Sequence, residues 1–242
     1  MEGVKSSQVN ELKQQLGEKI VESDEKFYKE ILKNFRSTKK EKLLSEWEYY
    51  TFYFLATAEV LVNRLIEEDA KKDRKIRLSS KMLIVPTVFI IRHSIELLLK
   101  YIVKKLNLQL KKDHNILSQY DLIQEQILSK KISFEEILSE KKVNEEVLKQ
   151  LMLQFINDDL SSLVAKYYYQ IPLLNSLSNE NYFIEDPANE LFRYPEADNI
   201  KFSFSSIDML NLPLREIRRM QEDVKILHQI RNFFGRIKLI KQ

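Results

Sequence analysis

Four ionisable side chains share one arc of an otherwise apolar helical segment near the middle of the chain: Arg92, His93, Glu96 and Lys100. Successive helical residues turn by about 100°, so Arg92, Glu96 and Lys100 stack one turn apart. His93 lies beside them. An imidazole beside a carboxylate can shuttle protons, and arginine or lysine can hold a phosphate. A buried charge needs a partner, so we expect Glu96 to pair with Arg92, Lys100 or both. The pattern predicts either an acid–base site or a buried salt-bridge network that fixes helix packing.

The other two histidines also have cations nearby. His114 comes shortly after two lysines in a polar turn, where it either caps the next helix or faces the Arg92–Glu96 arc across a helix hairpin. His228 and Arg231 lie one turn apart in the last long helical segment. We interpret that side of the segment as a solvated face, with a degenerate active site as the alternative.

The composition of the chain indicates its fold class. Its 242 residues can form one large domain with an appended arm. Hydrophobic residues make up 44% of the chain, which is enough for a sizeable core and argues against general disorder. There are only three glycines, and because tight β-hairpins depend on glycine, their scarcity favours long helices. The composition therefore predicts a mainly all-α fold.

Several chemistries are excluded by what the sequence lacks. It has no cysteine, which excludes disulfides and cysteine nucleophiles, and three histidines are too few for a histidine-rich metal centre. Glycine-rich phosphate loops, nucleophile elbows and H-E-x-x-H motifs are missing too, so we expect no cofactor and no metal. The net charge of +3 is too small for a dedicated nucleic-acid binder, although local basic clusters could still contact phosphates.

The sequence also predicts where the protein works. Its first residues lack the apolar core of a signal peptide. The most apolar stretch, Met82–Ile91, has ten uncharged residues before Arg92 interrupts it, far fewer than the ~20 needed to cross a bilayer. We therefore expect a cytoplasmic protein with no membrane contact.

Apolar residues recur at helical spacing along most of the chain. The segment Met82–Leu106 is apolar around nearly its whole circumference, which predicts the central and most buried helix. Residues 1–40 are expected to form an N-terminal helical arm that packs along the body or a second subunit, and 41–242 the main helical domain. Near 182–204 the pattern becomes irregular, which predicts a small insertion with a β-hairpin. The other expected elements are helices over Leu43–Glu68, Ile116–Leu128, Ser133–Ser139 and Asn144–Ile156, one opened by Asp158 or Asp159 and ending near Tyr169, and one from Pro213 to about Ile240, with hairpin strands over Phe192–Tyr194 and Lys201–Phe204.

Three short motifs, RHSIELLLKYIV, HNILSQYDLI and FRYP, together resemble a pattern in bacterial HEPN-like proteins. In these proteins an R-H-x-x-E-L-x-L-K helix leads to an H-[DN]-L-x-x-L segment. HEPN proteins are helical and usually dimeric, and many act as ribonucleases in toxin–antitoxin, abortive-infection and CRISPR-linked defence. The matching residues are Arg92, His93, Glu96, Leu97, Leu99 and Lys100 in the first motif, His114, Asn115, Leu117 and Tyr120 in the second, and Phe192, Arg193, Tyr194 and Pro195 in the third.

One departure from that family bears on activity. Catalytic HEPN proteins carry R-x(4–6)-H on a single helix, which brings the arginine and the histidine together at the dimer groove. No histidine in this chain has an arginine at that spacing before it. The nearest imitation begins at Arg231-Asn232 and has Lys238 where the histidine would stand. Resemblance to the fold therefore does not carry RNase activity with it.

The resemblance implies a HEPN-like effector of a bacterial antiphage-defence or toxin–antitoxin system. Such an effector would either cleave RNA, as a metal-independent ribonuclease with a degenerate motif, or bind it. It would work as a homodimer or with a partner protein of the same system. The alternative is a non-catalytic helical interaction subunit that assembles with, or neutralises, a partner enzyme. The expected catalytic residues are Arg92, His93, Glu96 and His114, and the expected binding residues are Lys100, Arg193, His228 and Arg231.

Overall fold

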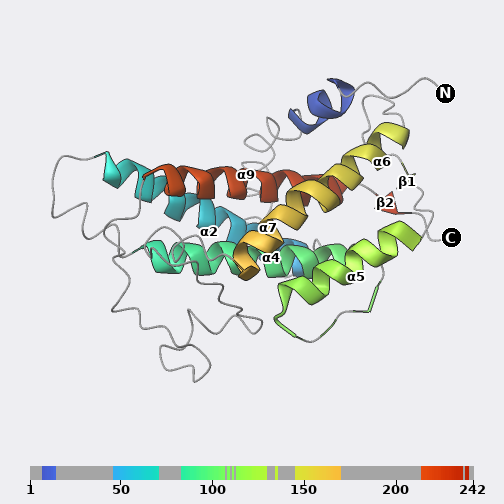
Figure 1. Ribbon diagram of the computed structural model, residues 1–242, viewed down its shortest axis with the longest axis horizontal. Helices are drawn as coiled ribbons and strands as arrows, with labels where there is room; N and C mark the ends of the chain where they lie inside the picture. The colour runs from blue at the N-terminus through green and yellow to red at the C-terminus, as the bar shows by residue number, and fades with distance from the viewer. Residues whose placement is uncertain are drawn as a thin grey trace, which may run out of the picture.

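The computed structural model describes residues 7–14, 46–70, 83–106, 108–109, 111, 113–129, 134–135, 145–169, 214–236 and 238–239 (Figure 1). Within these residues the fold is helical apart from one two-residue strand pairing, so the prediction of a mainly all-α fold is confirmed. None of the described helices combines the length and the apolarity needed to cross a bilayer. The expected insertion near 182–204, with Arg193, and most of the expected arm over 1–40 lie outside the described residues.

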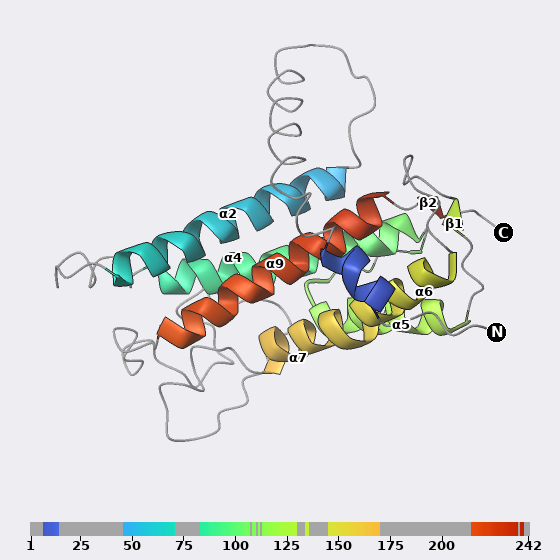
Figure 2. The same cartoon turned by 90° about the horizontal axis from the view of Figure 1, so that it is seen from above.

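Three long helices form the body of the molecule: α2 (Glu46–Asp69), α4 (Ile84–Lys105) and α9 (Leu214–Arg236). α2 packs against both of the others, and all three run along the long axis (Figure 1, Figure 2). A shorter helix, α5 (Ile116–Ser129), packs on α4. A second helical run consists of α6 (Glu145–Gln154), the π-helical segment η1 (Phe155–Leu160) and α7 (Ser161–Tyr169). Its α7 and η1 parts pack on α5, α4 and α9.

The helix α4 is the centre of the core. From Ile91 to Val103 every residue except His93 is buried, and α4 packs against α2, α5, α7 and α9. Removing apolar surface from water is favourable in free energy. A helix that is apolar around nearly its whole circumference therefore contributes most to folding when it is buried on all sides. The prediction of a central helix over Met82–Leu106 is confirmed for Ile84–Lys105.

Pro86 lies in the first turn of α4, where its ring causes little harm. The helix begins at Ile84, and the N–H of Thr87 bonds back to the carbonyl oxygen of Leu83 at 2.9 Å. The N–H groups of a first helical turn have no partner within the helix, so the N–H that proline lacks costs no hydrogen bond here.

The run 145–169 is continuous, whereas the sequence pattern predicts a new helix opened by Asp158 or Asp159. That prediction is wrong because η1 joins the two helices without a break. The wider turn of a π-helix accommodates one extra residue, and here it keeps Phe155 and Leu160 buried while both aspartates stay outside the core.

The strand pairing corrects two further predictions. β1 (Phe134–Glu135) lies where a helix over Ser133–Ser139 is predicted, and β2 (Lys238–Leu239) lies where the last helix is predicted to continue to Ile240. The strands are antiparallel, with Phe134 opposite Leu239 and Glu135 opposite Lys238. The intrinsic helix propensities of ordinary residues differ by only a few tenths of a kcal/mol per residue. Pairing between two segments that are distant in the sequence can override so small a preference.

A short helix over residues 7–14 is the described part of the expected arm. Its Val9 is buried in the main hydrophobic core. Its Lys13 pairs with Asp159, and the ammonium lies 5.3 Å from the ring centre of Phe155. This part of the arm therefore packs along the body, on the π-helical segment η1.

Candidate functional site

The polar arc expected on the central helix is present on α4, and Glu96 is its centre. Glu96 is 1% exposed, and its two carboxylate oxygens bond to three side chains. Lys100 Nζ lies 2.8 Å and His114 Nδ1 lies 2.9 Å from Oε1, and His93 Nδ1 lies 3.3 Å from Oε2. We call these four residues the Glu96 cluster. The predicted pairing of Glu96 with Lys100 is confirmed.

Helical periodicity brings three members of the Glu96 cluster together on α4. His93 precedes Glu96 by three residues and Lys100 follows it by four, and both spacings place side chains on one face of a helix. Most neighbouring positions of α4 are apolar and buried, with Arg92 and Ser94 as the polar exceptions. Water is therefore excluded from the carboxylate, and the side chains of the cluster supply its hydrogen bonds.

His114 reaches the cluster from the turn that precedes α5. Asn115 caps this helix, because its Oδ1 accepts hydrogen bonds from the N–H of Leu117 at 3.0 Å and of the following residue at 3.1 Å. The side chain of Gln119 donates to the carbonyl oxygen of Lys111 at 3.0 Å and holds the other side of the turn. Of the two interpretations of His114, the structure shows that it faces the arc, since the capping falls to Asn115.

Aromatic rings enclose the cluster on the side of His93 and Lys100. The ring of Phe54 meets the ring of His93 edge-on with centres 4.6 Å apart, and Phe89 stacks on it at 5.9 Å. The ring centre of Trp47 lies 5.9 Å from Lys100 Nζ, within the range of a cation–π interaction. The helical spacing of these aromatic residues indicates only a core face, so their contact with the site could not be read from the sequence.

Glu96 stays ionised at neutral pH despite its burial. Burial alone would raise its pKa, but hydrogen bonds from His93 and Lys100, the charge of Lys100 and a hydrogen bond from His114 outweigh burial and lower the pKa to about 2. Because an ionised carboxylate only accepts hydrogen bonds, both histidines present a protonated Nδ1 to it. Nε2 of each imidazole is then the atom that can exchange a proton with another molecule.

The Glu96 cluster is open on the side of His114. The side chain of His114 is 46% exposed and that of His93 is 17% exposed, whereas the carboxylate lies beneath them. A ligand can therefore reach His114, and the exposed edge of His93, without uncovering Glu96. Two imidazoles on one carboxylate, with the ammonium of Lys100 beside it, can supply a general base, a general acid and a cation for developing negative charge.

The structure does not place every expected site residue at this opening. Arg92 lies on the same helix but is fully buried, so it belongs to the core and not to the surface that a ligand could touch at His114. Arg193, an expected binding residue, lies outside the described residues.

His228 is buried at 3% exposure and Arg231 at 6%, so the interpretation of their side of the last helix as a solvated face is wrong. The reason is that α2 packs against α9 and covers these side chains. Nε2 of His228 lies 3.4 Å from Oε2 of Glu59. This contact outweighs the partial burial of Glu59 and lowers the pKa of its carboxyl group.

The guanidinium of Arg231 is held between α2 and α9. It lies 4.7 Å from the ring centre of Phe52, its Nη1 donates to Oδ1 of Asn232 at 3.0 Å, and its Nη2 lies 3.9 Å from Oε1 of Glu48. Burial raises the pKa of Glu48, with the positive charge of Arg231 opposing the change. Arg231, where the nearest imitation of R-x(4–6)-H starts, therefore lies in the interface between α2 and α9. The Glu96 cluster lies elsewhere, at the junction of α4 and α5.

Comparison with known proteins finds no relative of this chain. No protein-family model matches the chain, and no curated protein or solved structure is significantly similar to it. The likeness to HEPN-like proteins therefore depends on the three short motifs. Two of these motifs meet in the Glu96 cluster, because the first contributes His93, Glu96 and Lys100 and the second contributes His114.

Proposed function

We propose that the protein is a HEPN-like effector of a bacterial antiphage-defence or toxin–antitoxin system, and that it cleaves RNA without a metal ion at the Glu96 cluster. The observation that carries the proposal is the pair of imidazoles, His93 and His114, on one buried, ionised carboxylate. Proton transfer near neutral pH is the chemistry for which histidine is best suited. A network that only fixed helix packing would gain little from His114, which is half exposed.

RNA brings its own nucleophile, the 2′-hydroxyl beside each phosphodiester. One imidazole takes the proton of this hydroxyl on Nε2 while the oxygen attacks phosphorus and the P–O5′ bond breaks. The other imidazole, protonated at Nε2, gives its proton to the departing 5′ oxygen. The products are a 2′,3′-cyclic phosphate and a 5′-hydroxyl. Lys100, which also bonds to Glu96, offsets the negative charge that develops on the phosphate oxygens.

Glu96 acts through the histidines and does not touch the substrate. Its contacts with both rings set their orientation and tautomer, and its negative charge stabilises whichever imidazole carries the extra proton. Since its pKa is about 2, the carboxyl group does not itself titrate where imidazoles do.

The proposed biological setting, and the proposal that a second copy or a partner protein takes part, depend on the resemblance to HEPN-like proteins. The support is that two of the three matching motifs supply all four residues of one cluster, although they are separated in the sequence.

The proposal is tested by incubating the purified protein with tRNA or total RNA in EDTA and identifying the ends of any products. We expect 5′-hydroxyl and 2′,3′-cyclic phosphate ends. Cleavage by His93→Ala should be slower by roughly 10²-fold or more, as when a general acid or base is removed. Products with 5′-phosphate ends would contradict this mechanism. So would intact RNA after incubation with the folded protein, alone and together with the protein encoded beside it.

One observation favours a second candidate, a non-catalytic interaction subunit. The Arg231-Asn232 pair is buried between α2 and α9, so the residues nearest to the HEPN catalytic motif are not offered to a substrate there. For such a subunit we expect a stable complex with the enzyme encoded beside it, a changed rate of that enzyme and no RNA cleavage. Co-expression followed by light scattering measures the complex, and a monomer that captures no neighbour counts against this candidate.

A further inference from the structure

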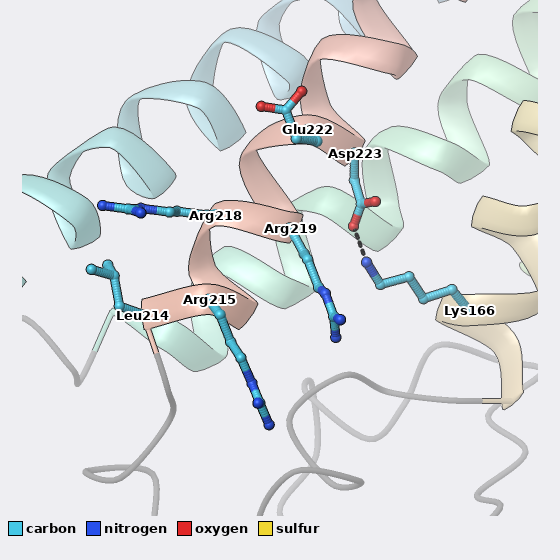
Figure 3. A pocket seen from close by; sticks show the side chains of 7 residues that line it. All are labelled: Lys166, Leu214, Arg215, Arg218, Arg219, Glu222 and Asp223. Carbon is cyan, nitrogen blue, oxygen red and sulfur yellow. Dashed lines mark hydrogen bonds and ion pairs between the residues drawn. The ribbon is translucent and has the colours of Figure 1, made fainter.

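A second polar site lies where α7 ends and α9 begins (Figure 3). It is a pocket of about 540 Å³, within the roughly 300–1,000 Å³ of small-molecule sites in proteins. None of its lining residues belongs to the Glu96 cluster, so it is a separate candidate site. The charged lining residues are Lys166, Arg215, Arg218, Arg219, Glu222 and Asp223.

Two arginines of the pocket are oriented by one buried carboxylate. Oε1 of Glu216 lies 2.8 Å from Nη1 of Arg219 and 3.3 Å from Nε of Arg215. Glu216 is buried, whereas both guanidinium side chains are mostly exposed. Figure 3 shows the two arginines extending in the same direction from α9. They are therefore held in place and still accessible to a ligand.

The carboxylates that line the pocket are already engaged. Asp223 bonds to Lys166 and accepts a hydrogen bond from the buried hydroxyl of Tyr167 at 2.8 Å. Glu222 accepts a hydrogen bond from the exposed Lys225 at 2.8 Å. Four cations line the pocket against these two carboxylates, and they still outnumber the carboxylates by one when the adjacent Glu216 is included, so the net charge is positive.

The start of α9 adds to this positive potential. The helix begins at Leu214, which also lines the pocket. The first N–H groups of a helix have no partner within it, and the helix dipole places its positive end there. Helix starts of this kind favour anions, and guanidinium groups match the oxygens of a phosphate in pairs. Both features select the same class of ligand.

We propose that this pocket binds a small, multiply charged phosphate compound, with the phosphate chain between Arg215, Arg219 and Lys166. Inorganic pyrophosphate and the phosphate chain of a nucleotide share this chemistry. The cations gather around one pocket, whereas an RNA backbone would call for an extended basic stripe. Arg218 points away from Lys166 and forms another flank of the site (Figure 3).

The test is titration calorimetry of the purified chain with pyrophosphate and, separately, with ATP. We expect binding that weakens with added salt, because exposed charges are screened. Arg215→Ala/Arg219→Ala should weaken it by roughly tenfold or more, as expected for the loss of charged hydrogen bonds. Similar affinities for both probes would assign the site to the phosphate chain alone, and a preference for ATP would show that the nucleoside contributes.

Two variants control for charge and folding. Lys104→Ala removes an exposed cation from α4, outside the pocket, and should leave binding unchanged. Arg215→Lys/Arg219→Lys keeps the charge but loses the paired donors, so its affinity should fall between those of the parent and the double alanine variant. It also keeps the test decisive if the alanine variant does not fold.

If neither pyrophosphate nor ATP binds the folded parent, the proposal is overturned. Parental affinity in both arginine variants would overturn it as well. Loss of RNA binding in these variants, without affinity of the parent for either probe, would assign the pocket to RNA and reject a small ligand. RNA cleavage at the Glu96 cluster uses other residues, so these outcomes are distinguishable from failure of the proposed function.

Discussion

Replacing Glu96 with alanine removes a carboxylate that, within the described residues, bonds to Lys100, His93 and His114. Lys100 is itself buried, so the variant leaves a cation in the core without the carboxylate to which it bonds. Breaking such a pair costs roughly 3–5 kcal/mol. The pKa of Glu96 gives an independent value, because a change from 4.5 to about 2 corresponds to about 3 kcal/mol in favour of the ionised form. We therefore expect Glu96→Ala to lower the free energy of unfolding by about 3 kcal/mol or more.

Urea unfolding at pH 7, followed by far-UV circular dichroism, measures this loss. Glu125→Ala is the matched control, because Glu125 is an exposed carboxylate on α5, and it should change stability by no more than about 0.5 kcal/mol. The double variant Glu96→Leu/Lys100→Met should recover most of the loss, since an apolar pair can replace a buried ion pair. If Glu96→Ala unfolds at the same urea concentration as the parent, the cluster is solvated and the reasoning is wrong.

Three further predictions concern Glu96, Tyr167 and Asp159. The lowered pKa of Glu96 stabilises the fold above about pH 4.5, and this stabilisation is lost as the pH falls toward 2. In urea titrations between pH 5 and pH 3, the free energy of unfolding should therefore fall more steeply for the parent than for Glu96→Gln. Equal slopes of the free energy of unfolding against pH would contradict this prediction. Tyr167→Phe removes a buried hydrogen bond to Asp223 and should cost about 1 kcal/mol in the same assay, whereas the exposed Tyr50→Phe should cost almost nothing. Asp159→Asn weakens the ion pair with Lys13 and should speed hydrogen exchange of the amides of residues 7–14 without changing the melting temperature by more than about 3 °C. Unchanged exchange would show that the other contacts of this helix, such as the packing of Val9 and Leu12 on the core, hold it without the ion pair.

The long helices could be predicted because helical periodicity is a local property of the sequence. α2 and α5 begin and end within a few residues of their predicted positions, and α4 is central as its apolar circumference predicts. The π-helical segment η1 could not be predicted, since Asp158 and Asp159 look like a helix start in the sequence. The strand pairing between β1 and β2 joins segments about a hundred residues apart, which a local pattern does not encode.

The Glu96 cluster could be predicted only in part. Spacing alone puts its three α4 residues on one face, but the approach of His114 depends on the turn before α5 and remained one of two alternatives. The polar side of α9 looks solvated because amphipathic spacing does not reveal that α2 covers it. Glu59 and Glu48, which compensate His228 and Arg231, come from that distant helix.

The central claim is that the Glu96 cluster transfers protons, and the single-turnover rate of RNA cleavage by His114→Ala in EDTA tests it most directly. Because the side chain of His114 is half exposed, its removal should leave the melting temperature close to that of the parent. The rate constant should fall by roughly 10²–10⁴-fold, and free imidazole in the buffer should restore part of it. A variant that melts with the parent and cleaves the same RNA at the parental rate would contradict the claim.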